Sequence, residues 1–385
     1  MNFETKAIRT QIEETQYREH SAPLFMTSSF TFENAEHMKT AFEGGTTDQV
    51  YSRYTNPNTN ELVQKMCLLE GAEAGIATAS GMAAIFSSIV CFLSAGDHIV
   101  LSKAVFGTTH RIVAKILPKW GISHTYLNPF DLDSWEQHIQ SNTKMLVLET
   151  PSNPGLALID LEKAGKIAKK HQLIYHVDNC FCTPYLQQPI KFGADIVVHS
   201  ATKFLDGQGR AMGGIVVGRK ELIDEVLFFT KATGPAMSPF NAWILSKSLE
   251  TLAIRMERHC SNALKLAEFL ENHPNILKVS YPGLPSHPNY LIAQKQMRHG
   301  GGIVSFEVKN GIDGGRNFLN SLKILSLTAN LGDSRTIATH PASTTHAKLP
   351  KEDKLALGIT DGLIRISVGL EHHEDIIADV EQALC

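Results

Sequence analysis

The chain reads Leu173-Ile-Tyr-His-Val177 followed by Asp178-Asn179, and then Asp195-Ile-Val-Val-His199 followed by Ser200-Ala-Thr-Lys203. Each is a short apolar run, typical of a strand buried on both faces, that ends in polar or charged residues. Ligands of open α/β sheets bind beyond the carboxyl ends of such strands. The chemistry of this protein is therefore expected in the residues that follow each strand.

The alternation of strand and helix continues on both sides of these stretches. Further apolar runs predict strands at Gly75–Ala79, His98–Leu101, Lys144–Glu149 and Gly214–Val217. Helical patterns lie between them, at Met82–Leu93, Thr108–Leu117 and Leu161–Lys170. Apolar strands that alternate with amphipathic helices indicate βα units, and so an α/β fold with a mostly parallel central sheet.

The pattern divides the chain into three parts. Residues 1–55 are polar, are broken by Pro23 and Gly44-Gly45, and predict an arm. Residues 56–240 form the predicted large domain, and residues 241–385 a smaller C-terminal α+β domain. A long helical stretch at Pro239–Leu270 is expected to lead the chain into the smaller domain. There we expect strands at Ile303–Val308, Ile324–Thr328 and Leu363–Val368, and a last helix at Glu374–Leu384.

Composition narrows the class of protein. The chain has 385 residues, 43% of them hydrophobic, and a net charge of −3, so no basic excess favours nucleic acid as a partner. We find no apolar run of membrane-spanning length and no signal-peptide pattern. The six cysteines match neither a disulfide framework nor a zinc site, and the seventeen histidines form no metal-ligand pattern. We interpret Cys180 and Cys182 as packing residues and expect a cytoplasmic protein without a metal.

The first strand is followed by Ala79-Ser80-Gly81-Met82, which opens a helix. A helix N-terminus after a glycine turn presents free backbone N–H groups and a positive dipole end, which suits a phosphate. Taken alone, the same residues more often mean an N-cap serine and a turn glycine.

Two later strands end at an acid and at a lysine. Asp178 either holds a backbone N–H or faces a cationic ligand, and the position alone leaves both open. Lys203 follows an apolar strand, where burial would lower the pKa of its amine, as a Schiff-base lysine requires. Ser200 and Thr202 beside it supply hydroxyls for an anion. The commoner alternative is a surface lysine at the start of a loop.

Together the three features predict a cofactor. A phosphate site, a carboxylate and a lysine follow three strands that end on one sheet edge. Pyridoxal 5′-phosphate (PLP) needs donors for its phosphate, an acid for its pyridine nitrogen and a lysine for its aldehyde. We find no G-x-G-x-x-G after the first strand, so the sequence does not favour NAD.

At these residues the sequence resembles the Cys/Met-metabolism (trans-sulfuration) family of PLP enzymes, which have the aspartate-aminotransferase fold, PLP fold type I. The resemblance covers nearly the whole chain. The matching residues are Ser80, Gly81 and Met82 of the phosphate turn, Asp178 as the pyridine partner, and Ser200, Thr202 and Lys203 of the lysine motif.

The resemblance implies further roles. Tyr51 and Arg53, in Tyr51-Ser-Arg-Tyr-Thr-Asn-Pro57, resemble an arm that reaches the phosphate of a neighbouring subunit's PLP. That implies a site shared between subunits, in a homotetramer built from dimers. Asn153 matches a loop residue near cofactor and substrate, and Arg365 matches the arginine that binds the substrate α-carboxylate.

Local departures point to one branch of the family. Where many lyases stack a tyrosine on the PLP ring this chain has Phe106, which stacks without a hydroxyl, and Thr108 stands where methionine γ-lyases often have cysteine. The strings Asp206-Gly-Gln-Gly-Arg210 and Asn330-Leu-Gly-Asp-Ser-Arg-Thr-Ile-Ala-Thr-His340 resemble the O-succinylhomoserine sulfhydrylases. His340 and His346 are expected near the substrate mouth.

The resemblance implies γ-replacement on an O-acylhomoserine, with sulfide giving homocysteine in methionine biosynthesis. Arg365 would hold the carboxylate, and Lys203 would take the Cα proton. The alternatives are a PLP-dependent γ-lyase, that is a carbon–sulfur lyase, or a cystathionine γ-synthase, and, in another class, a non-catalytic PLP-binding protein. The sequence leaves open the acyl group, the sulfur donor, the balance of replacement and elimination, and the oligomer size.

Overall fold

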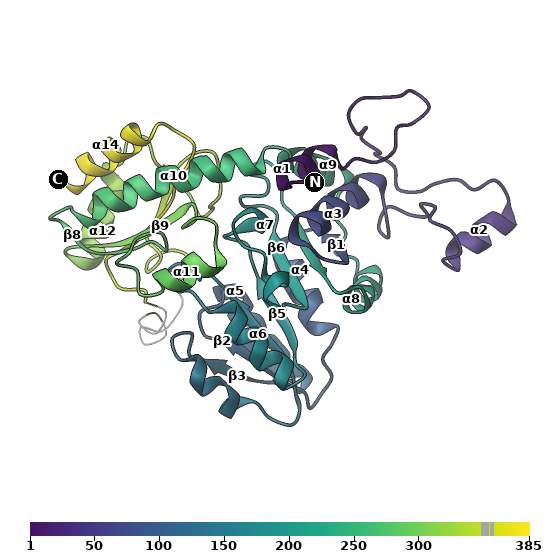
Figure 1. Cartoon of the computed structure of the whole chain (residues 1–385), viewed down its shortest axis with the longest axis horizontal. Coiled ribbons are helices and arrows are strands. Elements are labelled where there is room, and N and C mark those ends of the chain that lie inside the picture. The colour runs from purple at the N-terminus through teal and green to yellow at the C-terminus, as the bar shows by residue number, and fades with distance from the viewer. Residues whose placement is uncertain (348–353, 355–357) are drawn as a thin grey trace.

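A computed structural model describes residues 1–347, 354 and 358–385. Figure 1 shows two lobes and a projecting arm. One lobe holds a seven-stranded sheet and the other, which carries the C-terminus, a five-stranded sheet. The long helix α10 (Leu252–Glu271) lies along the second lobe and runs toward the first. The division into domains near residue 240 stays a prediction.

The larger sheet has the strand order β1-β7-β6-β5-β4-β2-β3. Its neighbouring strands are parallel from β6 to β3, and only β7 runs against the others. The mostly parallel sheet that the sequence indicates is therefore present. The strands are β1 (Ala74–Thr78), β2 (His98–Ser102), β3 (Ser123–Leu127), β4 (Thr143–Glu149), β5 (Ile174–Asp178), β6 (Ile196–Ser200) and β7 (Gly214–Gly218).

Helices cover both faces of this sheet, which is why its strands are apolar throughout. One face packs against α3 (Pro57–Glu70) and α6 (Leu161–Lys170). The other packs against α4 (Gly81–Val90) and α8 (Lys220–Thr233). Shorter helices of this half of the chain are α5 (Gly107–Arg111), with a π-helical turn at Ile112–Ile116 after it, and α7 (Thr183–Leu186).

The smaller sheet has the order β10-β11-β12-β9-β8 and is antiparallel except for the pair β10–β11. Helices α10 and α14 pack on it around a separate apolar core. Its strands are β8 (Ile276–Ser280), β9 (Ile303–Val308), β10 (Ser326–Leu327), β11 (Ile337–Thr339) and β12 (Leu363–Ser367). Helix α14 spans His373–Leu384, and the remaining helices of this part of the chain are α11 (Tyr290–Gln296) and α12 (Gly311–Ser321).

The helical stretch predicted at Pro239–Leu270 is two helices, α9 (Pro239–Leu249) and α10. Helix α9 ends at Leu249. The backbone oxygen of Ser248 accepts from the backbone and hydroxyl of Thr251 and from the buried Arg255 guanidinium. A carbonyl that is diverted in this way cannot continue the helical ladder. The polar strand β3 and the short β8 and β11 were not expected, because they lack a clear apolar run.

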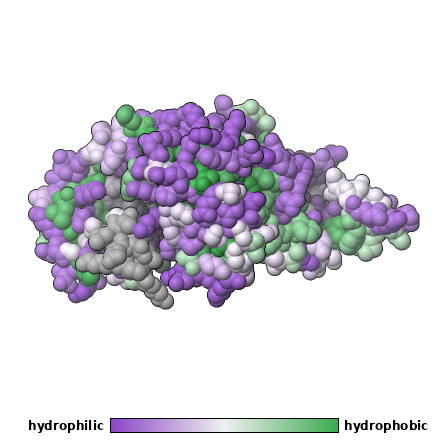
Figure 2. All heavy atoms as spheres, turned by 90° about the horizontal axis from the view of Figure 1, so that it is seen from below, coloured by the Kyte–Doolittle hydropathy of each residue, from purple (hydrophilic) through white to green (hydrophobic). Residues whose placement is uncertain are grey.

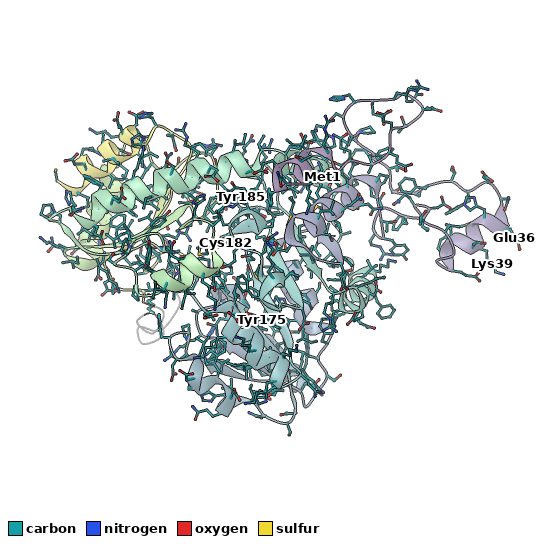
Figure 3. The ribbon with its side chains drawn as sticks, in the orientation of Figure 1. Met1, Glu36, Lys39, Tyr175, Cys182 and Tyr185 are labelled. Atoms are coloured by element: carbon teal, nitrogen blue, oxygen red, sulfur yellow. The ribbon has the colours of Figure 1, made fainter. Side chains whose placement is uncertain are left out.

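The N-terminal residues have two locations. Helix α1 (Phe3–Arg9) packs on its own chain, where the Phe3 ring meets the Tyr185 ring edge-on at 5.1 Å between centroids. Helix α2 (Ala35–Phe42) lies at the far end of the arm, with Glu36 and Lys39 at its tip (Figure 3).

The face shown in Figure 2 is mostly hydrophilic, with hydrophobic residues interspersed, among them some toward the arm. No helix among the described residues is both long and apolar enough to cross a membrane.

Candidate active site

Three polar side chains meet at the carboxyl edge of the larger sheet. Glu149 ends β4, Asp178 ends β5 and Ser200 ends β6. Glu149 pairs in register with Asp178, so the two acids lie side by side on adjacent strands. This edge borders a cavity of about 230 Å³. The lining residues are Ser80, Gly81, Met82, Ile85, Phe106, Glu149, Asn153, Asp178, Cys180, Phe181, Ser200, Thr202, Lys203, Ala329, Leu331, Thr345 and Arg365.

The first turn of α4 forms one wall. Ser80 is its N-cap, and the Ser80 hydroxyl oxygen accepts from the backbone N–H of Ala83 at 3.2 Å. Gly81 lies so close to Ser200 that an added Cβ would meet the Ser200 Cβ at 2.6 Å. Glycine is therefore required for the helix N-terminus and the end of β6 to meet, and both face the cavity. Backbone N–H groups at a helix N-terminus beside hydroxyls suit a phosphate.

Lys203 projects from the loop after β6. Its Nζ donates to Asn330 Oδ1 at 2.5 Å, which joins the larger lobe to the smaller one. Burial lowers the pKa of Lys203, and the charge of Arg365 lowers it further against an opposing effect of Cys180. A larger share of neutral amine favours reaction with an aldehyde. Beside it, Thr202 Oγ1 accepts from Gly213 N at 3.2 Å.

The acid pair has unusual proton affinities. Burial raises the pKa of Asp178 to about 6, although the backbone N–H of Cys180 donates to it at 3.0 Å. Burial and the neighbouring Asp178 raise the pKa of Glu149 well above its usual range. Asp178 thus accepts from a backbone N–H and also borders the cavity, and its role toward a cationic ligand stays a prediction. An acid that faces a pyridinium nitrogen there would regain a charged partner.

Arg365 lies on β12 and reaches the cavity from the smaller lobe. Its Nη1 donates to Asn153 Oδ1 at 2.9 Å and its Nη2 to the Asn330 backbone oxygen at 3.1 Å. Nε is buried without a partner, and burial lowers the pKa of Arg365 to about 10. No carboxylate of the described residues pairs with it. A buried guanidinium in this state calls for an anionic ligand.

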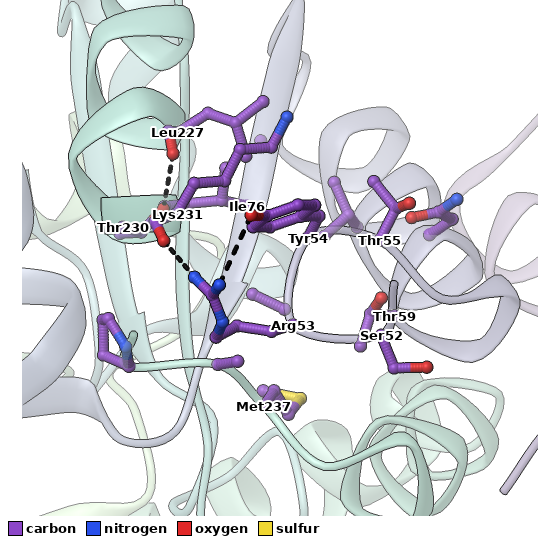
Figure 4. Close-up of a pocket in the computed structure, with 16 residues that line it drawn as sticks. Ser52, Arg53, Tyr54, Thr55, Thr59, Ile76, Leu227, Thr230, Lys231 and Met237 are labelled. Carbon is purple, nitrogen blue, oxygen red and sulfur yellow. Dashed lines mark hydrogen bonds between the residues drawn. The ribbon is translucent and has the colours of Figure 1, made fainter. Parts of the chain in front are cut away.

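Two predicted residues lie elsewhere. Tyr51 and Arg53 do not line this cavity. The Arg53 guanidinium donates to the Lys231 backbone oxygen and to the Tyr54 hydroxyl, in a different pocket (Figure 4). Tyr51 lies in the exposed arm, and the centroid of its ring is 5.5 Å from the guanidinium carbon of Arg53. Their expected role in a neighbouring subunit stays a prediction.

The two histidines differ. His340 is buried and satisfied, with Nδ1 on the Ser343 hydroxyl and Nε2 on the Asp361 backbone oxygen, both at 2.8 Å. His346 adjoins Thr345 of the cavity wall, its Nε2 has no hydrogen-bond partner in the part of the chain that the structure describes, and burial lowers its pKa to about 4. A substrate role for either stays untested.

The sequence interpretation did not assign a site role to Glu149, which lines the cavity, or to Asn330, which contacts Lys203. Glu149 ends a predicted strand at the same edge as Asp178, so the rule that singled out Asp178 also applied to Glu149. Asn330 opened one of the branch-specific strings, but its contact with Lys203 spans 127 residues of sequence and no local pattern predicts it. All six cysteines are free, and the described residues contain no group of three acids, histidines or cysteines suited to a metal ion.

The residues present fit PLP. A glycine turn too tight for a Cβ offers donors to the phosphate, and Lys203 lies across the same cavity from the acid pair. The orphaned Arg365 Nε leaves a buried donor for an amino-acid carboxylate. Phe106, at the start of α5, adds an aromatic ring to the wall.

Comparison with curated proteins agrees with this fit. The chain is 46% identical over 382 residues to an O-succinylhomoserine sulfhydrylase of Pseudomonas aeruginosa, with 99% of this chain and 95% of the relative covered. It is 44% identical over 383 residues to an L-methionine gamma-lyase of Fusobacterium nucleatum, covering 99% and 97%.

Solved structures show the same fold. An O-acetylhomoserine (thiol)-lyase from Campylobacter jejuni, which carries N′-pyridoxyl-lysine-5′-monophosphate, superimposes with a TM-score of 0.96 at 36% identity over 100% of both chains. The metB protein of Corynebacterium glutamicum gives 0.93 at 36% identity, covering 100% of this chain and 98% of that one. The predicted fold class and cofactor are thereby confirmed. Since the family model for Cys/Met metabolism PLP-dependent enzymes also matches residues 4–385, the chain belongs to that family.

Proposed function

We propose that this enzyme replaces the acyloxy group of an O-acyl-L-homoserine, with O-succinyl-L-homoserine the preferred ester, by sulfide, giving homocysteine and the free acid. The family supports replacement and elimination at the γ-carbon in general. The observation that supports the proposal is the linkage of Lys203 and Arg365 through Asn330, because both side chains line one cavity, where Lys203 could act as a base and Arg365 could bind a carboxylate.

The α-carboxylate of the substrate is assigned to Arg365. Its guanidinium is already oriented by Asn153 Oδ1 and the Asn330 backbone oxygen, and Nε remains free to donate. Because this buried charge has no counterion among the described residues, a bound carboxylate gains a strong charge-assisted contact. The substrate Cα is thereby held on the side of the cavity where Lys203 lies.

PLP, when bound, supplies an electron sink for the pair released as a proton leaves Cα. The residues do the rest. Lys203, whose pKa is lowered by burial, accepts the Cα proton and returns a proton later. Asp178 would accept a hydrogen bond from the pyridine N–H and so keep that nitrogen protonated. Ser80, Ser200 and Thr202, together with the first turn of α4, bind the phosphate.

A γ-lyase activity is the second candidate, because methionine gamma-lyases match this chain almost as well as the sulfhydrylase does, at 44% against 46% identity. Phe106 favours the sulfhydrylase, since its ring borders the cavity without a hydroxyl that could serve as a leaving-group acid.

We also propose that Tyr51 and Arg53 complete the phosphate site of a neighbouring subunit. The assembly would be a homotetramer, built as a dimer of dimers, in the cytoplasm. The arm that carries them is separate from the cavity of its own chain. It also exposes large apolar side chains, which a second subunit would cover: Tyr17, Met26, Met38 and Phe42.

The deciding experiment compares O-succinyl- and O-acetyl-L-homoserine on purified holoenzyme, each with and without sulfide, and scores homocysteine against 2-oxobutyrate. Sulfide-dependent homocysteine, formed faster from the succinyl ester, is the expected result. Faster turnover of the acetyl ester would correct the donor. Mainly 2-oxobutyrate and ammonia regardless of sulfide would assign the enzyme to the γ-lyases.

A further inference from the structure

Glu149 is the cavity acid that the proposed reaction does not use. It is 5% exposed and ends β4 next to Asp178 in register. Burying a second carboxyl group beside the first is costly, because two neighbouring charges repel one another in a poorly solvated site. A side chain kept at such a position needs a structural or chemical role.

The contacts of Glu149 lead to two separate loops. Its Oε2 accepts from the backbone N–H of Phe106 at 2.6 Å. The backbone N–H of Asn153 lies near the same carboxyl group and lowers its pKa. Phe106 carries the aromatic ring of the cavity wall, and Asn153 carries the amide oxygen that orients Arg365. One side chain thus joins the wall proposed for the cofactor ring to the loop proposed for the substrate carboxylate.

We propose that Glu149 is a positioning residue, which fixes the Phe106 and Asn153 loops relative to the end of β4 through the acceptor oxygens of its carboxyl group. A buried backbone N–H that loses its acceptor is costly. Without Glu149 both loops would shift to find other partners or water. The binding sites proposed for the cofactor ring and the substrate carboxylate would then no longer be held in a fixed position relative to each other.

The role requires an acceptor oxygen and no negative charge. Burial and the neighbouring Asp178 raise the pKa of Glu149, which favours the protonated form of the carboxyl group over the charged form. A neutral carboxyl group still accepts through its carbonyl oxygen. Glutamine has the same shape and keeps that oxygen, whereas alanine removes it. The pair of substitutions therefore separates positioning from proton chemistry.

The test uses holoenzyme of Glu149→Ala, Glu149→Gln and Ser152→Ala. Ser152 is the matched control, because its Oγ accepts from the Ala157 backbone N–H at 3.0 Å in the same loop, outside the cavity wall. We measure amide hydrogen exchange of the peptides that contain Phe106 and Asn153, PLP affinity, and kcat and KM separately, for whichever ester or sulfur amino acid the enzyme turns over.

For Glu149→Ala we expect faster exchange in both peptides, and PLP Kd and KM raised by about 10- to 100-fold, the equivalent of one buried N–H left unpaired. Glu149→Gln restores exchange at Phe106 and brings KM back to within about 3-fold of wild type. Ser152→Ala changes exchange near Ala157 and leaves KM at the wild-type value.

Two results overturn the proposal. In one, the alanine variant keeps wild-type exchange, PLP affinity and KM. In the other, the glutamine variant loses turnover as fully as alanine while exchange stays normal, which would give the carboxyl a proton-transfer role. If Glu149→Ala does not fold, Glu149→Gln alone decides by the same criteria. Exchange is measured without substrate, so the proposal can fail independently of the sulfhydrylase assignment, although it rests on the roles proposed for Phe106 and Asn153.

Discussion

The amine of Lys203 is the group to which we assign both the bond to the cofactor and the proton transfer. Lys203 is partly buried near the start of the loop after β6, and its Nζ donates to Asn330 Oδ1 at 2.5 Å. An ammonium in such a place is destabilised, because burial removes its hydration and Arg365 repels it. The same two effects make the neutral amine available as a nucleophile and a base.

Replacing Lys203 with alanine should abolish turnover, since no other described lysine lines the cavity. We expect a loss of at least about 10²- to 10⁴-fold, as for removal of a positioned base, together with loss of the lysine–PLP absorbance band. Steady-state assays and spectra of the purified variant measure both. Lys220→Ala, at an exposed ion pair with Asp224, is the control. Substantial turnover by Lys203→Ala without added amine would refute the assignment.

The pH dependence of cofactor binding follows from the lowered pKa of Lys203. Only the neutral amine attacks the aldehyde, so the rate of PLP incorporation into cofactor-free protein should rise with pH. It should level off below the ordinary value of 10.5, because the folded pKa lies below it. Stopped-flow absorbance against pH gives the midpoint.

Asn330→Asp supplies the control for that pH profile. A carboxylate beside the Lys203 amine stabilises the ammonium and moves the midpoint upward. A wild-type midpoint at or above 10.5, or no upward movement in the aspartate variant, would contradict the assigned environment of Lys203.

Helix α4 is the element on which the phosphate site depends. Its ten residues begin at Gly81, directly after the end of β1, and its axis points the N-terminal N–H groups at the cavity edge. Ser80 satisfies one of those groups by capping. The close approach of Gly81 to Ser200 fixes where the helix can start.

Gly81→Ala should weaken PLP binding, because the added methyl group would meet Ser200 Cβ at 2.6 Å and its Cα at 2.9 Å. Overpacking of this kind should raise the PLP Kd by roughly 10- to 100-fold. Fluorescence titration of the cofactor-free variant measures the Kd. Gly107→Ala, whose methyl group would meet no atom closer than 4.0 Å, should bind PLP normally. Equal Kd values for the two variants would show that the turn tolerates a side chain.

Elements with strong local signals were predicted closely from the sequence. Strand β9 and helix α6 have the predicted bounds, and β4 differs by one residue at its start. Their burial patterns are regular, so the period of the sequence reports them. The break between α9 and α10 escaped prediction, because it depends on hydrogen bonds from Thr251 and Arg255 to the Ser248 carbonyl, which the hydrophobic period of the stretch does not report.

At the scale of the whole molecule, the arm residue Arg53 lies in a different pocket from the one that Lys203 lines. Arg53 donates to the Lys231 backbone oxygen at the outer side of α8, away from the cavity that Lys203 lines. If the arm serves a neighbouring subunit, as we propose, each active site needs residues from two chains. This arrangement can be tested without a structure of the assembly.

Mixing Lys203→Ala subunits with Arg53→Ala subunits should restore activity. In a mixed dimer one site has an intact Lys203 and receives an intact Arg53 from its partner, so random mixing should give about a quarter of the native sites. Activity after subunit exchange, with light scattering to record the oligomer, measures this. Each variant alone is the control. A mixture no more active than the mean of its parents would place Arg53 in its own subunit's chemistry or outside it.

The sequence by itself determined the sheet, its functional edge and most of the cavity. Apolar runs and the polar residues that end them are local features, and parallel strands bring their ends to one edge whatever the loops do. Ser80, Asp178, Ser200 and Lys203 could be named for that reason.

Only the tertiary structure decided which side chains touch. Segments far apart in the chain are joined by three hydrogen bonds: Lys203 to Asn330, Arg365 to Asn153, and the Phe106 backbone N–H to Glu149. Such contacts depend on how two lobes and several loops pack, and the periodicity of one segment carries no information about its distant partners.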